Sequence, residues 1–447
     1  MFSLIELKQV LTDQMDDILR CDDELLPRRN ERHLKELIYS SKLIKVVLGV
    51  RRSGKSTLCK QCLERGATAY VNFDDERLAI LDTKDLNKVI QVLDTLYPDA
   101  RYLFFDEIQN IEKWELFVNR LHRGGRNVIL TGSNGKLLGK DLATHLTGRQ
   151  VSTILRPLIF SEFLSWRMPS FASSNQAIIT TTVYSELKRH FDEFFELGGF
   201  PEVVRGEPQK IYLQELFDKI VTRDIVQRFK VREAKVLKEI ALYLIQNSSQ
   251  KTSFKSLKNV YNLKSITTAK KYYGYLLDVF LLDELRGYSY KLTERSTSPR
   301  KTYSCDLGVM KALWSKPTVD LGAKLETLVF LELRARDAEI YYIHENKKEV
   351  DFCVVENGKP KSLIQVCFDL SPPKTREREI RSLIEIGEKY GVNDLQIVTM
   401  DEEEHIQVKS HKIKVWPAYK FCLSIGLEPW STGSRDHSKY ESLPRYN

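Results

Sequence analysis

The first third of the chain alternates short apolar runs with amphipathic segments. The runs are too short for buried helices, which predicts strands covered on both faces, and the amphipathic segments predict the covering helices. We therefore expect an α/β domain on a parallel sheet over residues 1–157. The predicted strands are residues 43–48, 69–73, 102–105, 128–131 and 151–155.

The pattern changes at residue 160, where the strand-like runs give way to helical periodicity. Gly198-Gly199-Phe200-Pro201 and a polar stretch at residues 169–176 interrupt it. We interpret residues 158–234 as a helical lid. Residues 235–303 predict three helices followed by a hairpin, which is the order of a winged helix. Residues 294–301 are its expected exposed wing.

The last part of the chain, residues 304–425, again mixes strands and helices. It predicts a helix, three strands, a long helix, a strand, and then a short strand and a helix. The three strands are placed at residues 341–344, 350–355 and 363–367, and the long helix at residues 375–390. Residues 426–447 are polar, and we expect a frayed tail there.

Composition and charge fit a folded protein. The chain is 42% hydrophobic and 29% charged, and its net charge of +8 permits contact with nucleic acid without arguing for it. Neither a secretory signal nor an apolar run of membrane-spanning length is apparent, so we expect a cytoplasmic protein without membrane contact. The irregular spacing of seven cysteines favours reduced thiols, and Cys59 and Cys62 are expected to pack in the core.

A phosphate-binding motif follows the first predicted strand and precedes a helix-compatible segment. In that context the glycines let backbone N–H groups face phosphates at a helix N-terminus, so we predict an ATP site. Lys55 is expected to reach the β- and γ-phosphates and Ser56 to bind magnesium. The residues assigned to the site are Gly49, Val50, Arg51, Arg52, Ser53, Gly54, Lys55, Ser56 and Thr57.

Polar residues end two further predicted strands. Asp106 and Glu107 follow a buried run, where an α/β sheet places its ligands. We expect Asp106 to hold magnesium and Glu107 to polarise the attacking water. Ser133 and Asn134 follow another run and are candidate sensors of the γ-phosphate, although an ordinary turn explains them equally well.

Two arginines are candidates for a catalytic arginine finger. Arg149, just before the fifth predicted strand, is the first choice, and Arg223, in Thr222-Arg223-Asp224, is the second. Such a residue raises the rate roughly 1,000-fold or more. For either one taken alone, a surface salt bridge is the simpler explanation.

Four motifs in this order resemble a known family. The chain is similar to prokaryotic AAA-type ATPases that carry a C-terminal domain of the PD-(D/E)xK nuclease-like fold. The resemblance spans nearly the whole chain, implies this domain order and leaves a homo-oligomer open. The motifs are the phosphate-binding loop, Phe105-Asp106-Glu107-Ile108-Gln109, Leu130-Thr131-Gly132-Ser133-Asn134 and Gly198-Gly199-Phe200-Pro201-Glu202.

The nuclease motif implied by this resemblance is incomplete. Glu326 and Asp351 match its acidic positions, but Gln365 is neutral where a magnesium ligand belongs, and Cys367 replaces the lysine. Without that cation the attacking water lacks a partner, so we expect a catalytically dead or very weak module retained for binding DNA or for packing against the ATPase. The alternative is a slow, divergent nuclease with a substituted ligand.

Basic residues of the expected winged helix are candidates for DNA contact. The alternative is a rigid spacer or a site for a protein partner. The sequence therefore leaves three functions open: ATP hydrolysis coupled to a DNA transaction, a nucleotide-gated switch acting on a protein partner, or an ATP-dependent nuclease. The candidate DNA contacts are Lys264, Lys270 and Lys271 on the third helix and Arg295, Arg300 and Lys301 in the wing.

Overall fold

The computed structural model describes residues 3–19, 25–135, 148–169, 180–289, 299–315, 320–346 and 348–423. Its N-terminal part is a five-stranded, wholly parallel sheet of order β2-β3-β4-β1-β5. All five predicted strands are confirmed to within one residue at each end. They are β1 (Ile44–Leu48), β2 (Thr68–Asn72), β3 (Tyr102–Asp106), β4 (Asn127–Gly132) and β5 (Gln150–Ile154).

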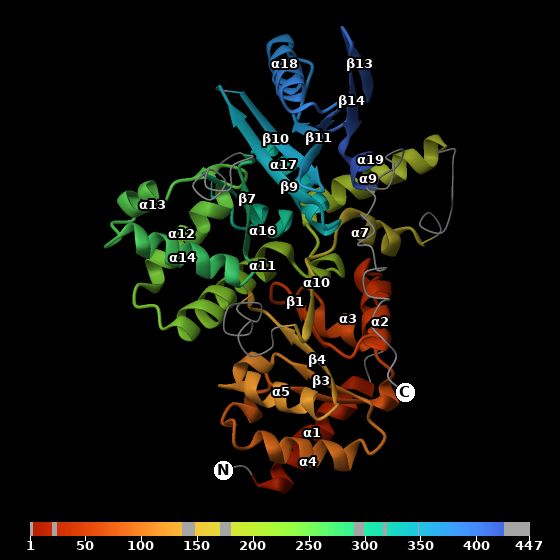
Figure 1. Ribbon diagram of the computed structural model, residues 1–447, viewed down its shortest axis with the longest axis vertical. Coiled ribbons are helices and arrows are strands. Elements are labelled where there is room, and N and C mark those ends of the chain that lie inside the picture. The colour runs from red at the N-terminus through yellow and green to blue at the C-terminus, as the bar shows by residue number, and fades with distance from the viewer. Residues whose placement is uncertain are drawn as a thin grey trace.

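Amphipathic helices cover this sheet, at the bottom of Figure 1. In α5 the buried residues Trp114, Phe117, Val118 and Leu121 recur at helical spacing, so one face packs on the sheet. Short 3₁₀ turns occur at Arg65–Ala67, Glu76–Leu78 and Ile108–Asn110. The helices are α1 (Leu4–Leu19), α2 (Asn30–Ser40), α3 (Lys55–Cys62), α4 (Leu86–Leu96) and α5 (Trp114–Arg123).

The next segment is helical, as its periodicity predicts. A Cβ on Gly199 would lie 2.0 Å from the carbonyl oxygen of Leu158, which explains the glycine there. The helix α11 continues without a break into a π-helical segment, Ile220–Gln227. The helices are α7 (Phe160–Arg167), α9 (Thr181–Leu197), α10 (Pro201–Val204) and α11 (Gln209–Lys219).

The next part of the chain combines helices with a small antiparallel sheet of order β6-β8-β7. Ser253 and Ser265 cap the second and third helices with their side chains. Arg300 and Lys301 lie in β8 rather than in the loop expected at residues 294–301. The elements are α12 (Ala234–Gln246), β6 (Lys251–Thr252), α13 (Phe254–Val260), α14 (Ile266–Asp278), β7 (Leu282–Arg286), β8 (Arg300–Ser304) and α16 (Leu307–Ala312).

The C-terminal part is a six-stranded mixed sheet of order β13-β14-β12-β11-β10-β9, at the top of Figure 1. The sequence prediction missed one strand, because β13 is polar and only half-buried at the sheet edge. The elements are α17 (Leu321–Ala335), β9 (Glu339–Glu345), β10 (Lys348–Glu356), β11 (Lys359–Val366), α18 (Pro373–Tyr390), β12 (Asp394–Thr399), β13 (Glu404–Val408), β14 (His411–Pro417) and α19 (Ala418–Leu423).

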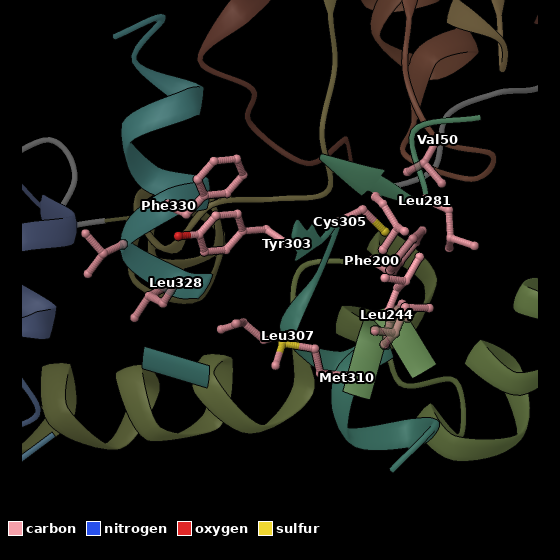
Figure 2. Close-up of a cluster of buried hydrophobic side chains, with 14 of the residues drawn as sticks. Val50, Phe200, Leu244, Leu281, Tyr303, Cys305, Leu307, Met310, Leu328 and Phe330 are labelled. Atoms are coloured by element: carbon pink, nitrogen blue, oxygen red, sulfur yellow. The ribbon is translucent and has the colours of Figure 1, made fainter. Parts of the chain in front are cut away.

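One buried apolar cluster joins these parts of the chain. Figure 2 shows Val50 of the phosphate-binding loop beside Phe200 and Leu281, and Tyr303 of β8 facing Phe330 of α17. The last two rings stack with centroids 3.9 Å apart. Among the described residues before residue 158, only Leu26 and Val50 belong to this cluster, and the N-terminal sheet packs in two clusters of its own. No helix in the described ranges is long and apolar enough to cross a bilayer.

Candidate functional site

The phosphate-binding loop connects β1 to α3, as its sequence context predicts. Gly49 has φ +152°, and a Cβ there would lie 2.0 Å from the carbonyl oxygen of Leu155. The loop therefore passes too close to the end of β5 for any side chain at this position. Lys55, the first residue of α3, is buried, and its ammonium donates to the carbonyl of Val50 at 3.0 Å.

The carboxyl ends of β3 and β4 bring a set of polar side chains to this loop. The hydroxyl of Thr131 donates to Asp106 Oδ1, and the Tyr70 hydroxyl donates to Asp106 Oδ2 at 3.1 Å. Ser56 also hydrogen-bonds this carboxylate. Burial raises the pKa of Asp106, and the neighbouring charge of Glu107 acts in the same direction.

Glu107 is held by several donors. Its backbone adopts φ +52°, a left-handed conformation uncommon outside glycine. The backbone N–H and hydroxyl of Ser133 donate to Glu107 Oε2 at 3.2 and 3.0 Å, and Lys55 Nζ lies 3.7 Å from Oε1. Burial alone would raise the pKa of Glu107, but Lys55, Gln109 and Arg51 outweigh it and lower the pKa. Glu107 is therefore ionised at neutral pH.

This arrangement fits a triphosphate and a magnesium ion. The Ser53 hydroxyl and Gln109 Oε1 are buried without a hydrogen-bond partner among the described residues, as expected for groups that face a polar ligand. The Ser56 hydroxyl and the Asp106 carboxylate are hard oxygen ligands of the kind that magnesium prefers. Asn134, the other candidate sensor, is buried next to Ser133 along the chain.

The two arginine candidates separate in the structure. Arg149 stands at the amino end of β5, where its carbonyl accepts from Ile44 N at 2.8 Å and its guanidinium donates to Asn119 at 2.7 Å. The phosphate-binding loop lies at the carboxyl ends of these parallel strands, and Arg149 lies at their amino ends. The prediction that Arg149 is the arginine finger is therefore wrong for the site of its own chain. Arg223 donates to Asp74 at 2.5 Å, and Arg51 of the loop pairs with the same carboxylate at 3.0 Å.

Sequence reasoning missed several residues of the site. Asp74 follows the end of β2, so the strand-end argument used for Asp106 would have found it. Asp224 interacts electrostatically with Arg51 and Glu107, but the sequence analysis considered only its neighbour Arg223. Arg28 donates to the carbonyls of Ser53 and Arg156 at 2.9 and 2.6 Å and thereby links the phosphate-binding loop to the segment after β5. No local pattern distinguishes Arg28 from the other arginines.

The candidate DNA contacts are only partly grouped. Lys264, Lys270 and Lys271 are exposed on or next to α14, and Lys270 and Arg300 both lie over the ring of Phe254, at 5.8 and 5.9 Å. Arg295 lies outside the described residues.

Lys301 is buried and contacts the C-terminal module, so its assignment to an exposed wing is wrong. Its ammonium lies 2.9 Å from Glu326 Oε1, 2.9 Å from Asp351 Oδ1 and 2.7 Å from Glu349 Oε1. Burial would lower the pKa of Lys301, but these three carboxylates raise it. The sequence predicts a carboxylate cluster without a lysine, because Cys367 stands at the lysine position. In the structure Lys301 of β8 supplies the ammonium instead.

The other two positions of the nuclease-like motif stay neutral. Gln365 is buried beside Glu379. The Cys367 thiol donates to the carbonyl of Asp369 at 3.1 Å, and burial raises its pKa to about 11, so it remains protonated at neutral pH. Among the described residues, no group of three or more His, Cys, Asp or Glu side chains is arranged to hold a metal.

Comparison with known proteins finds two matching family models, an AAA domain at residues 41–164 and a Domain of unknown function (DUF8612) at residues 188–322. An uncharacterized protein of Methanocaldococcus jannaschii is 34% identical over 404 residues, covering 85% of this chain and 88% of the relative. An uncharacterized protein of Haemophilus influenzae is 30% identical over 378 residues, covering 80% and 91%.

Solved structures give weaker likenesses. A Walker-type ATPase of Pyrococcus abyssi has 14% identity and a TM-score of 0.42, with 66% of this chain and 97% of that chain covered. The Orc1 protein of Aeropyrum pernix in complex with DNA has 15% identity and a TM-score of 0.30, with 66% and 95% covered. TM-scores this low carry no functional argument. The assignment of a nucleotide site therefore rests on the matched AAA domain and on the geometry of the phosphate-binding loop.

Proposed function

The chain belongs to the family of AAA-domain proteins that includes these archaeal and bacterial relatives, and we propose that it hydrolyses ATP with magnesium. The single observation that carries the proposal is the convergence of Lys55, Asp106 and Glu107 at the end of the parallel sheet. The ammonium of Lys55 lies 3.7 Å from Glu107, and Asp106 is hydrogen-bonded to Thr131 and Ser56. These are the parts that phosphoryl transfer to water requires.

Each of these residues has a proposed role. The loop from Gly49 to Thr57 binds the phosphates, with Lys55 on the β- and γ-phosphates. Ser56 and Asp106 would hold magnesium, which when bound neutralises charge on the phosphates. Glu107, ionised and oriented by Ser133, accepts a hydrogen bond from the attacking water and polarises it. Ser133 and Asn134 then lie where a γ-phosphate sensor belongs.

We further propose that hydrolysis is coupled to a DNA transaction. Residues 235–303 have the order of a winged helix, with α14 as its recognition helix, and residues 158–234 form the lid. The stretch of residues 251–271 contains six lysines and no acidic residue. Such a stretch favours contact with phosphates. The revised contact set is Lys264, Lys270, Lys271, Arg295 and Arg300, without Lys301.

The C-terminal module fits a supporting role in this proposal. A mixed sheet with helices on its faces is compatible with a nuclease-like fold over residues 304–425. Its carboxylates are already paired with Lys301, Lys251 and Tyr303. We therefore propose that the module binds DNA or packs against the ATPase rather than cleaving.

A nucleotide-gated switch is the second candidate function. It is favoured by the contact between the loop after β4 and α14, where a Cβ on Gly135 would lie 3.3 Å from the carbonyl oxygen of Asp278. A sensor loop that touches the next module is suited to reporting the nucleotide state to a protein partner or to a second copy of the chain.

Steady-state ATP hydrolysis with and without duplex, branched and single-stranded DNA tests these functions. We expect hydrolysis to be lost in Lys55→Ala and in Glu107→Gln, and to rise severalfold with DNA. Hydrolysis that is unaffected by any DNA would replace the DNA proposal with the switch. Hydrolysis that persists in both variants would overturn the assignment of the site.

A further inference from the structure

The lid segment Ile220–Gln227 is π-helical along its length. Extended π-helical stretches are rare, and single π turns are frequent at functional sites. Ile220, Val221 and Ile225 are buried in the shared core and fix the segment in place. Asp224 lies among these apolar positions, and only 4% of it is exposed.

Asp224 lies within electrostatic range of the ATP site. The charged groups that act on its carboxylate are Arg51 of the phosphate-binding loop, Glu107, and the lid arginines Arg228 and Arg223. Asp224 Oδ2 is buried and has no hydrogen-bond partner among the described residues. A buried carboxylate oxygen without a partner is costly, so the free energy of this arrangement is sensitive to any further charge placed near Asp224.

A second carboxylate ties the lid to the loop. Asp74 Oδ2 pairs with Arg51 at 3.0 Å, and Asp74 Oδ1 pairs with Arg223 at 2.5 Å. Asn110 donates to Asp74 at 3.2 Å and accepts from Arg228 at 3.3 Å. Arg51, Arg223 and Arg228 are therefore linked to one another through Asp74 and Asn110.

We propose that Asp224 makes the lid respond to the γ-phosphate of ATP and not to ADP. The inference rests on the proposed ATP site. A γ-phosphate bound between Lys55 and Glu107 brings negative charge into this set of arginines. It attracts Arg51 away from Asp74 and Arg228 away from Asn110, and it repels Asp224. ADP lacks the γ-phosphate and leaves the contacts of these arginines unchanged. The π-helical segment therefore shifts only with ATP.

In this account Asp224 is a positioning residue, because it acts through the arginines and the lid rather than by touching the nucleotide. Asp224→Asn keeps the shape of the side chain and removes its charge. The variant should bind a non-hydrolysable ATP analogue about tenfold more tightly than the wild type, because one like-charge repulsion is removed. Its affinity for ADP should stay within about twofold.

Calorimetric titration of both nucleotides measures this selectivity. Asp192→Asn is the matched control, since it removes an exposed carboxylate from the same lid, and it should change neither affinity. Equal changes for the two nucleotides in Asp224→Asn, or weaker binding of the ATP analogue, would overturn the role of Asp224. A wild type that binds neither nucleotide would instead overturn the ATP site itself.

Hydrogen exchange of the wild type provides a test that needs no variant. Backbone amides of residues 220–227 should change their exchange rate with the ATP analogue and keep it with ADP. Exchange rates that stay unchanged with both nucleotides, at concentrations where both are bound, would also contradict the proposal.

Discussion

The ammonium of Lys301 lies 2.9 Å from Asp351 Oδ1 and so joins β8, in the small antiparallel sheet, to β10 of the C-terminal sheet. Both groups are almost fully buried, and Glu326 and Glu349 share the same ammonium. The cluster is thus an internal joint between two modules.

Lys301→Met should destabilise the protein by about 3–5 kcal/mol, because it leaves buried carboxylates without their cation. Urea unfolding followed by tryptophan fluorescence measures the loss. The double variant Lys301→Met with Asp351→Asn should recover part of the stability, since fewer buried charges are then unpaired. A single variant that costs under about 1 kcal/mol would show that this joint is unimportant for stability.

The buried carboxylate of Glu332 should make the unfolding free energy depend on pH. It accepts from Phe160 N at 3.0 Å and lies 3.9 Å from Arg336. Burial raises the pKa of Glu332 from 4.5 to about 7 against the opposing charge of Arg336. The folded protein therefore holds this proton more tightly than the unfolded chain, and the resulting stability is present below pH 4.5 and lost as the pH rises through about 7.

Glu332→Gln keeps the hydrogen-bond acceptor and removes the titration. We expect the unfolding free energy of the variant to exceed that of the wild type by about 3 kcal/mol at pH 8, with the difference shrinking toward pH 5. Denaturant unfolding at several pH values measures the difference curve, in which other titrating groups cancel. A difference that is constant with pH would contradict the assignment.

Gly49→Ala should abolish nucleotide binding. The new Cβ would meet the Leu155 carbonyl oxygen at 2.0 Å, so the loop has to move. Gly66→Ala is the control, because a Cβ at that position meets no atom within 4 Å. Binding of a fluorescent ATP analogue compares the two variants. Wild-type affinity in the Gly49→Ala variant would show that the loop geometry is not required.

The two arginines should differ in their effect on hydrolysis. Arg223→Gln removes a guanidinium that shares Asp74 with Arg51, and we expect the rate of ATP hydrolysis to fall by about tenfold or more. Arg149→Gln should leave the basal rate of the isolated chain near that of the wild type. A large loss in Arg149→Gln alone, dependent on protein concentration, would indicate that Arg149 acts on the site of a second copy.

DNA binding should depend on exposed lysines of α14. Replacing Lys270 or Lys271 by alanine should weaken binding similarly for all sequences and lower the slope of log affinity against log salt by about one each. Lys113→Ala, an exposed lysine of the ATPase core, serves as control. Fluorescence anisotropy at several salt concentrations makes the comparison, and slopes equal to that of the control would remove α14 from the interface.

The sequence alone determined the ATPase sheet and the core of its site. Apolar runs, a glycine-rich loop and carboxylates at a strand end are local signals, and hydrophobic burial leaves them few alternative arrangements. The phosphate-binding loop, Asp106 and Glu107 therefore lie together as expected.

Only the tertiary structure decided which distant charges meet. Local context ranked Arg149 ahead of Arg223, yet Arg149 stands at the amino end of β5, away from the phosphate-binding loop, and Arg223 reaches Asp74. Lys301 follows a basic stretch typical of an exposed loop, but β8 pairing turns it inward to Asp351, 50 residues further on. Pairing of charges across modules depends on how the modules pack, and no local pattern carries that information.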